Sequence, residues 1–289
     1  MASGWIILDK PTDMTSRTAG GRLRRLFGAS TFGHIGTLDP MASGVLPIAL
    51  GTATKMIPFM PGENTKEYLF ALKFGMETDT LDITGQVVRT TDKTPERADV
   101  LAACGQLTGD IMQVPPMFSA VHVGGRRAYD LARQGKTVDM PARPVHIDAL
   151  SLEKIEGDQW YFRVQCGAGT YVRSIGRDLG RLTGGLATVT MIRRIQTHGF
   201  GIKDAVTLDF LENWVHNGGD VRAYLHAPDF GLGDIPVINL ADGAADLYRH
   251  GGFIDVMGTA PGLVRVYVGD TFIGMGCVTD GVLRPKRTL

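Results

Sequence analysis

One acidic residue stands alone in a stretch of small and apolar residues near the N-terminus. Asp39 lies in the segment GTLDPMASGVLP, residues 36–47, and it is the only carboxylate between Asp13 and Glu63. An aspartate before a proline is usually a turn residue whose side-chain oxygen accepts a backbone N–H. A carboxylate among apolar residues is instead shielded from water, which strengthens its short-range interactions. Asp39 is therefore a candidate catalytic carboxylate.

Motifs of several common enzyme classes do not occur in this sequence. There is no GxxxxGK[ST] loop, no GxGxxG sequence after a strand, and no HExxH or GxSxG motif. The seven histidines include no i,i+4 pair, and the cysteines at 104, 166 and 277 are too widely spaced for a zinc site or a disulfide framework. We therefore expect no cofactor and no metal ion, so that ordinary side chains carry the chemistry.

Hydrophobic patterns indicate the elements that position Asp39. WIILD at 5–9 is typical of a buried strand, and apolar residues recur at helical spacing over 15–28. Residues 66–74 and 160–166 alternate with period two and predict strands, and a helix is expected from Pro95. Strands and helices mix without strict βαβ repetition. This predicts an α+β fold with a mixed, largely antiparallel sheet.

The C-terminal part has a different pattern of short strands. LVRVYV, TFIGMGCV and VLRPKR follow one another with Gly-Asp and Asp-Gly turns between them, which predicts a small β-barrel-like domain. We expect two domains, 1–234 and 235–289, because 289 residues exceed a typical single domain.

A helix with two distinct faces is predicted over 172–182. At 100° per residue three arginines share one arc and four aliphatic residues lie opposite: Arg173, Arg177 and Arg181 against Val172, Ile175, Leu179 and Leu182. The pattern predicts a buried apolar face and an arginine face that is either solvated or in contact with phosphates.

Charge is balanced overall but unevenly distributed. The chain has 30 basic and 30 acidic residues. Residues 204–255 hold nine acidic residues and two basic ones, Arg222 and Arg249, a net charge of −7 that leaves +7 on the rest of the chain. A net charge of zero for the whole chain is thus compatible with a basic functional surface. A basic n-region and an apolar stretch of about 20 residues are both lacking, so we expect no signal peptide, no membrane span and a cytoplasmic location.

Five segments together resemble one family. GHIGTLDPMASGVLP at 33–47 resembles the catalytic loop of the TruB family of tRNA pseudouridine synthases. LDKPTDMTS at 8–16, TKEYLFALKFGMETDTLDITG at 65–85 and CGAGTYVRSIGRDLG at 166–180 resemble its Lys-Pro, tyrosine and arginine motifs. VPPMFSAVHVGGRRAYDLARQG, within an insertion over about 114–143, resembles its RNA-gripping segment, and the terminal strands resemble a PUA domain.

The resemblance implies a role for each matched residue. Asp39 would be the catalytic nucleophile, attacking uracil C6 or ribose C1′, or acting as a base. Tyr68 would stack on the flipped base, although a tyrosine in a core strand would show the same pattern. Arg173 would pair with Asp39 and keep it ionised and oriented. His34 would lie near the flipped nucleotide or make a structural hydrogen bond.

Other residues are candidates for support and for RNA contact. Lys10 would support the active-site wall and Ile192 would line the uracil pocket, unless both serve packing alone. RNA-backbone contacts are expected from four arginines, Arg126, Arg127, Arg177 and Arg193. Gly124 and Gly125, next to Arg126 and Arg127, suit a mobile loop that binds phosphates.

The implied substrate is the uridine at position 55 in the T loop of tRNA, bound by a monomer through the T arm without a cofactor. A loop lowers the cost of flipping a base. The alternative from another class is a non-catalytic tRNA-binding or folding chaperone of the same fold. A glycosidase with a carboxylate pair is a third possibility, disfavoured because no second acid lies near Asp39 in the sequence.

Overall fold

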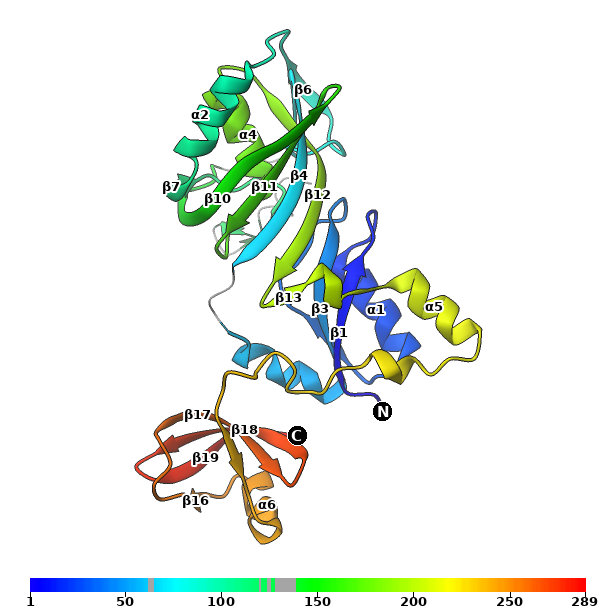
Figure 1. Ribbon diagram of the computed structural model, residues 1–289, viewed down its shortest axis with the longest axis vertical. Coiled ribbons are helices and arrows are strands. Elements are labelled where there is room, and N and C mark those ends of the chain that lie inside the picture. The colour runs from blue at the N-terminus through cyan, green and yellow to red at the C-terminus, as the bar shows by residue number, and fades with distance from the viewer. Residues whose placement is uncertain (62–64, 120, 124–125, 128–138) are drawn as a thin grey trace.

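The computed structural model describes residues 1–61, 65–119, 121–123, 126–127 and 139–289, with the side chains of 122–123 and 126–127 left aside. Figure 1 shows an elongated molecule with an upper lobe, a middle region and a C-terminal barrel along its long axis. In the described part of the chain, no helix combines the length and apolarity needed to cross a membrane.

A mixed sheet of ten strands runs through the upper lobe and the middle region. Its order is β14-β1-β3-β12-β4-β11-β10-β7, with β13 on β12 and β2 on β3. The strand bounds are β1 Gly4–Lys10, β2 Phe32–His34, β3 Ser43–Leu50, β4 Lys66–Phe74, β7 Gly109–Gln113, β10 Arg143–Glu156, β11 Gln159–Cys166, β12 Ala187–Thr197, β13 Phe200–Gly201 and β14 Val206–Thr207. Two pairings, β1 with β14 and β3 with β12, are parallel and the others are antiparallel.

Four α-helices and three 3-10 helices accompany this sheet in the described residues. Their bounds are α1 Ser16–Leu26, α2 Arg97–Gln106, α4 Val172–Leu182, α5 Leu208–His216, η1 Gly51–Phe59, η2 Ile202–Asp204 and η3 Val221–Tyr224. The main core lies between the sheet and α1, α2 and α4, where Leu23, Val100 and Ile175 are fully buried. Figure 1 shows α2 and α4 on the upper lobe and α1 with α5 beside β1 and β3.

The two halves of the sheet meet where β3 runs parallel to β12. The register there is short, Arg193 opposite Ser43 and Arg194 opposite Gly44. Gly44 has a φ of +106°, and a Cβ at this position would lie 2.1 Å from the carbonyl oxygen of Arg194. Only glycine permits this approach, so Gly44 fixes how the strand after Asp39 joins the rest of the sheet.

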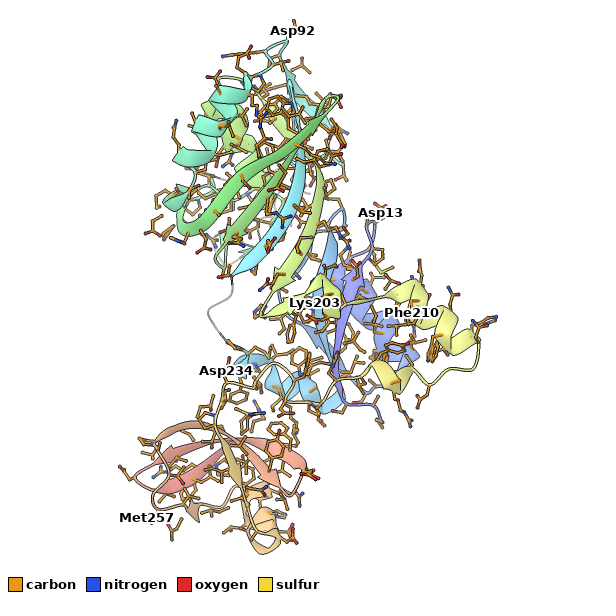
Figure 2. All side chains as sticks on the ribbon, viewed as in Figure 1. Asp13, Asp92, Lys203, Phe210, Asp234 and Met257 are labelled. Atoms are coloured by element: carbon orange, nitrogen blue, oxygen red, sulfur yellow. The ribbon has the colours of Figure 1, made fainter. Side chains whose placement is uncertain are left out.

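The C-terminal strands form a separate five-stranded sheet in the order β15-β17-β18-β19-β16. The bounds are β15 Val237–Asn239, β16 Ile254–Asp255, β17 Gly262–Val268, β18 Thr271–Thr279 and β19 Val282–Thr288, with α6 at Asp242–Arg249. Figure 2 labels Asp234 at the connection between the barrel and the main body. Met275 of β18 belongs to the same core cluster as Trp5, Met60 and Leu232, so this sheet packs on the main body.

Two small hairpins lie outside these sheets, β5 Met76–Thr78 with β6 Val87–Thr90, and β8 His122–Val123 with β9 Arg126–Arg127. The second hairpin belongs to the predicted insertion over 114–143. Gly124 and Gly125 lie outside the described residues.

The prediction of an α+β fold with a mixed, largely antiparallel sheet and a small terminal β-barrel is confirmed. The strand over 66–74 is confirmed to the residue, and Tyr68, Phe70 and Leu72 are buried on one face of it. The helix over 172–182 is in place, but of the arginine face that was expected to be either solvated or in contact with phosphates only Arg181 is exposed. Arg173 and Arg177 are buried, whereas Leu182 is exposed.

Candidate active site

Asp39 lies in the loop between β2 and β3, within a tight turn. Gly36, three residues earlier, has a φ of +65°, and the Ala42 amide donates to the Asp39 carbonyl oxygen at 3.1 Å, so that Asp39 is the first residue of the turn. The Asp39 side chain is 39% exposed. The expectation that this carboxylate is shielded from water is therefore wrong for the free protein, because one side of it faces open space.

Arg173, from the first turn of α4, forms an ion pair with Asp39. Its Nη2 lies 2.8 Å from Asp39 Oδ2, while its own side chain is only 4% exposed. Nη1 donates to the Thr80 carbonyl oxygen and Nη2 to that of Phe118, each at 3.0 Å. Two backbone carbonyls thus hold the guanidinium in place, and the held guanidinium orients the carboxylate.

A second carboxylate lies on the other side of the same guanidinium. Asp82 Oδ2 is 3.7 Å from Arg173 Nε, and the residue is buried. Asp82 Oδ1 accepts hydrogen bonds from the Thr80 hydroxyl and from the amide and hydroxyl of Thr84. Sequence reasoning missed Asp82 because 43 positions separate it from Asp39. These donors hold Asp82 as an acceptor, which does not suit the acid role that a glycosidase pair requires.

Three further residues fix the Asp39 loop at successive points. The Arg194 Nη2 donates to the Gly36 carbonyl oxygen at 2.7 Å. The hydroxyl of Ser16, the first residue of α1, accepts from the Leu38 amide at 2.9 Å and donates to the Leu38 carbonyl oxygen at 3.0 Å. Lys10 Nζ donates to the carbonyl oxygen of Pro40 at 3.4 Å. The loop is thereby preorganised before any ligand binds.

Arg194 is the most deeply buried of these anchors. It has no exposed surface, and its Nε donates to the Val45 carbonyl oxygen at 2.7 Å. A side-chain hydrogen bond also joins it to Tyr68. The sequence analysis did not single out this arginine. The available signal was its place in an apolar, alternating strand, where an arginine requires internal partners.

Lys10 is fully buried and also donates to the carbonyl oxygens of Pro11 and Met14, both at 2.7 Å. Burial lowers the pKa of Lys10 from 10.5 to about 8, against the opposing effect of Asp13 and Asp39. The structure thus places the predicted lysine beneath the Asp39 loop.

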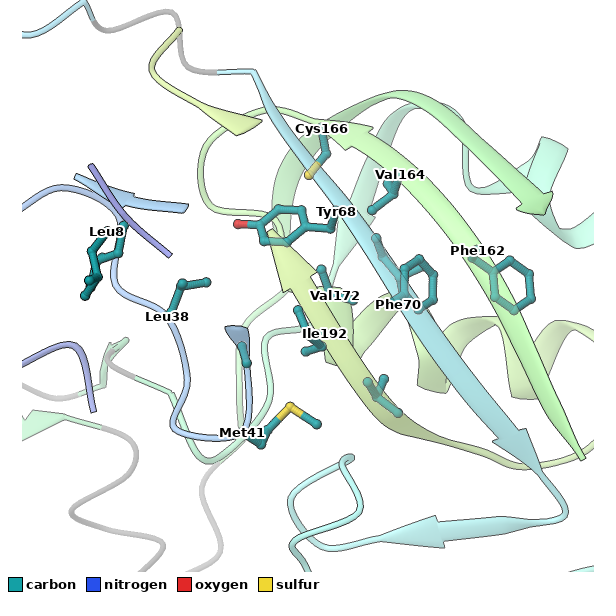
Figure 3. Packing of buried hydrophobic residues seen from close by; sticks show 14 of the residues in the cluster. Leu8, Leu38, Met41, Tyr68, Phe70, Phe162, Val164, Cys166, Val172 and Ile192 are labelled. Carbon is teal, nitrogen blue, oxygen red and sulfur yellow. The ribbon is translucent and has the colours of Figure 1, made fainter. Parts of the chain in front are cut away.

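A small cavity of about 210 Å³ opens beside the carboxylate. Its walls include Asp39, Arg173, Tyr68 and Ile192. Figure 3 shows the Tyr68 ring projecting from β4 toward the segment that carries Leu38, with Ile192 of β12 beside it. Burial raises the pKa of the Tyr68 hydroxyl, although the neighbouring Arg194 lowers it. Four of the predicted site residues are therefore in one cavity.

A wider groove of about 1120 Å³ adjoins this cavity and shares Thr37, Leu38, Asp39, Ser119 and Arg173 with it. His34 lines the groove. Burial lowers the pKa of His34, and the positive charge of Arg194 lowers it further. The Nδ1 atom of His34 is buried without a hydrogen-bond partner among the described residues. A buried polar atom without a partner is uncommon in folded proteins.

The arginines expected to contact RNA lie in different settings. Arg177 is buried, and its guanidinium donates to Asp178 and to the Val114 carbonyl oxygen, so it offers no surface to a phosphate. Arg193 is half-buried and bidentate with Asp9, at 2.7 and 3.1 Å. Arg126 and Arg127 form β9, and their side chains lie outside the described residues.

Comparison with known proteins gives a consistent result over nearly the whole chain. Residues 24–172 match the model of the TruB family pseudouridylate synthase N-terminal domain, and 236–289 match the C-terminal model of pseudouridine synthase II TruB. The chain belongs to the TruB family of pseudouridylate synthases.

Two curated relatives cover almost all of this TruB-family chain. A protein of Gluconacetobacter diazotrophicus named tRNA pseudouridine synthase B is 40% identical over 99% of this chain and 97% of its own length. One of Bradyrhizobium diazoefficiens with the same name is 40% identical over 98% and 85%. The solved structure of a Cbf5-Nop10-Gar1 complex has a chain with a TM-score of 0.70 at 22% identity, covering 99% of this chain and 84% of its own, which shows a shared fold.

The described part of the chain contains no group of three or more His, Cys, Asp or Glu side chains arranged to hold a metal ion. The residues that are brought together are a carboxylate, a guanidinium, a phenol and aliphatic side chains. The candidate site therefore offers nucleophilic, basic and electrostatic chemistry from its own side chains.

Proposed function

We propose that the protein isomerises uridine to pseudouridine in tRNA, at position 55 of the T loop. The observation that carries the proposal is the Asp39–Arg173 pair, in which a half-exposed carboxylate is oriented by a buried arginine at the mouth of a small cavity. The reaction detaches uracil from C1′, turns it and reattaches it through C5. The carboxylate acts on C1′ or on C6, or takes a proton, and each route requires the same contact with an everted base.

The cavity supplies what a flipped uracil needs. Tyr68 gives a flat face in place of the lost stacking, and Ile192 gives an apolar wall. His34 has an unpartnered buried nitrogen for the flipped nucleotide, and Lys10 supports the loop beneath Asp39. The chemistry needs no cofactor, because the bond broken and the bond formed both belong to the substrate.

The wide groove suits one arm of a folded RNA. Arg17 and Arg24 line it and are exposed, so they are available to backbone phosphates. We assign 1–234 to catalysis, with an RNA-gripping insertion over about 114–143 that includes Arg126 and Arg127, and 235–289 to RNA binding by a PUA-like barrel. The protein would act as a monomer on the T arm in the cytoplasm.

The proposal is tested by incubating the purified protein with an unmodified tRNA transcript and mapping pseudouridine at single-nucleotide resolution. We expect one modified position, uridine 55, and no product on a transcript in which that uridine is replaced by cytidine. Tight binding of tRNA without any pseudouridine would contradict the proposal and favour the non-catalytic chaperone.

A further inference from the structure

Two side chains of β4 line the small cavity from one wall, Tyr68 and Lys66. They are two residues apart in a strand, so they point to the same face of the sheet. The strand register places Lys66 opposite Cys166 of β11 and Tyr68 opposite Arg194 of β12. The Cα atoms of Lys66 and of the tyrosine proposed to stack on uracil are therefore about one strand repeat, roughly 7 Å, apart.

The Lys66 ammonium has no ion pair or side-chain hydrogen bond with any of the residues that the structure describes. Burial lowers the pKa of Lys66, and the charge of Arg194 lowers it further, with Cys166 opposing the shift. A half-buried cation without a counter-charge is unfavourable for the free protein. An unfavourable group of this kind on a cavity wall indicates an anionic or strongly polar ligand.

The position of Lys66 distinguishes between the parts of a nucleotide that it would meet. Lys66 lines the small cavity, where Tyr68, Ile192 and Val172 supply apolar surface, and it does not line the wide groove. The exposed cations Arg17 and Arg24 line the groove and not the cavity. The cations of the groove are therefore placed to contact the RNA backbone, whereas Lys66 is placed to contact the base.

We propose that Lys66 is a catalytic residue whose ammonium group contacts a carbonyl oxygen of the flipped uracil and stabilises the charge on the detached ring. This inference rests on the proposed function. When the C1′–N1 bond breaks, its electron pair leaves with uracil, and the negative charge spreads over N1 and the two ring oxygens. The ring then turns and C5 bonds to C1′. The C5 proton is released to water and N1 takes up a proton from water, so the product is an isomer and Lys66 is unchanged. A positive charge fixed beside the developing anion lowers the barrier to the first step.

The test compares Lys66→Met, Lys66→Gln and Lys66→Arg with the wild type on a T-arm RNA. We expect the single-turnover rate at saturating RNA to fall on the order of 100-fold in Lys66→Met and Lys66→Gln. Lys66→Arg keeps the charge and should retain most of the rate. The RNA dissociation constant and its salt dependence should stay close to wild type, because no phosphate contact is lost. Thermal unfolding reports whether each variant is folded. Two neutral variants are used so that the test remains possible if one of them does not fold.

The matched control is Arg24→Met, which removes an exposed cation of the groove. It should reduce the slope of log K against log salt by about one. A Lys66→Met or Lys66→Gln protein that keeps the wild-type rate at saturating RNA overturns the inference. So does one whose salt slope falls by about one, as expected for Arg24→Met, because Lys66 would then be a phosphate ligand. If the wild type itself forms no pseudouridine, the proposed function fails and not this inference alone.

Discussion

Two aspartate–arginine pairs in this molecule are built alike but differ in how far the aspartate is exposed. Arg173 and Arg265 both donate to backbone carbonyls, those of Thr80 and Phe118 in the first case and of Gly233 and Ile235 in the second. Each also binds an aspartate, Asp39 at 2.8 Å or Asp229 at 2.9 Å. The aspartate side chain is 39% exposed in the first pair and 9% exposed in the second.

The difference separates a pair that acts on a ligand from one that holds the chain together. Asp229 also accepts from the Tyr267 hydroxyl, so the connecting segment is fixed to β17 and the carboxylate has little room for another partner. Asp39 has the fixed guanidinium of Arg173 on one side, and on the other it borders both the small cavity and the wide groove. The Asp229 pair also gives a structural role to part of the acidic stretch over 204–255, as does the pairing of Glu212 with Arg22.

Replacing the two arginines tests this contrast most strongly. Arg173→Met should lower the rate of pseudouridine formation by about 10²–10³-fold, because Asp39 loses its orienting charge. Arg265→Met should leave the rate of the folded protein near wild type and reduce its stability by roughly 3 kcal/mol, since a largely buried aspartate is left unpaired. Single-turnover assays and chemical denaturation measure both effects. Equal rate losses in the two variants would remove the distinction.

Two glycines test how strictly the Asp39 loop is fixed. Gly44→Ala places a methyl group 2.1 Å from the Arg194 carbonyl oxygen, so β3 and β12 must move apart and both stability and rate should fall. Gly28 also has a positive φ, +61°, but a Cβ there has no neighbour within 4 Å. Gly28→Ala should therefore cost only about 1–2 kcal/mol of stability, with no change in rate. A Gly44→Ala protein no worse than Gly28→Ala would show that the junction adapts.

A further expected effect, on stability alone, comes from the titration of Lys10. Its pKa is about 8 in the folded protein and 10.5 in the unfolded chain. Between these values the unfolded chain holds the proton that the folded protein has released, so stability rises with pH. The difference in unfolding free energy between wild type and Lys10→Met should be flat below pH 8 and then grow in favour of the wild type, by a few kcal/mol at most, toward pH 10. A difference that stays constant from pH 7 to pH 10 would contradict the shift.

The fold and part of the site follow from the sequence for identifiable reasons. Alternation in 66–74 revealed β4 and the facing of Tyr68, because that strand has one clear buried face. The strand β3 was missed, since Pro47 and small residues suggested a loop, and seven of its eight residues are buried without alternation. The strands β10 and β12 were also left unassigned.

The rest of the site depends on contacts between residues far apart in the chain. Arg173 and Arg177 occupy the polar arc of α4, but carbonyl oxygens of other segments cover that arc and bury it. The residue pattern within α4 carries no information about carbonyl groups that belong to other segments. The same holds for Asp82, which meets Arg173 across 91 positions, and for Ser16, which binds the Leu38 backbone while the neighbouring Thr15 caps the helix. Local pattern predicts which element a residue joins, and tertiary packing decides what that residue touches.

The most direct test is the structure of Asp39→Asn protein bound to a T-arm RNA, since this variant should bind the substrate without converting it. We expect uridine 55 turned out of its loop into the small cavity, with its ring between Tyr68 and Ile192 and its glycosidic bond next to the residue 39 side chain. A uridine that remains stacked in the RNA loop, with residue 39 facing only solvent, would contradict the account.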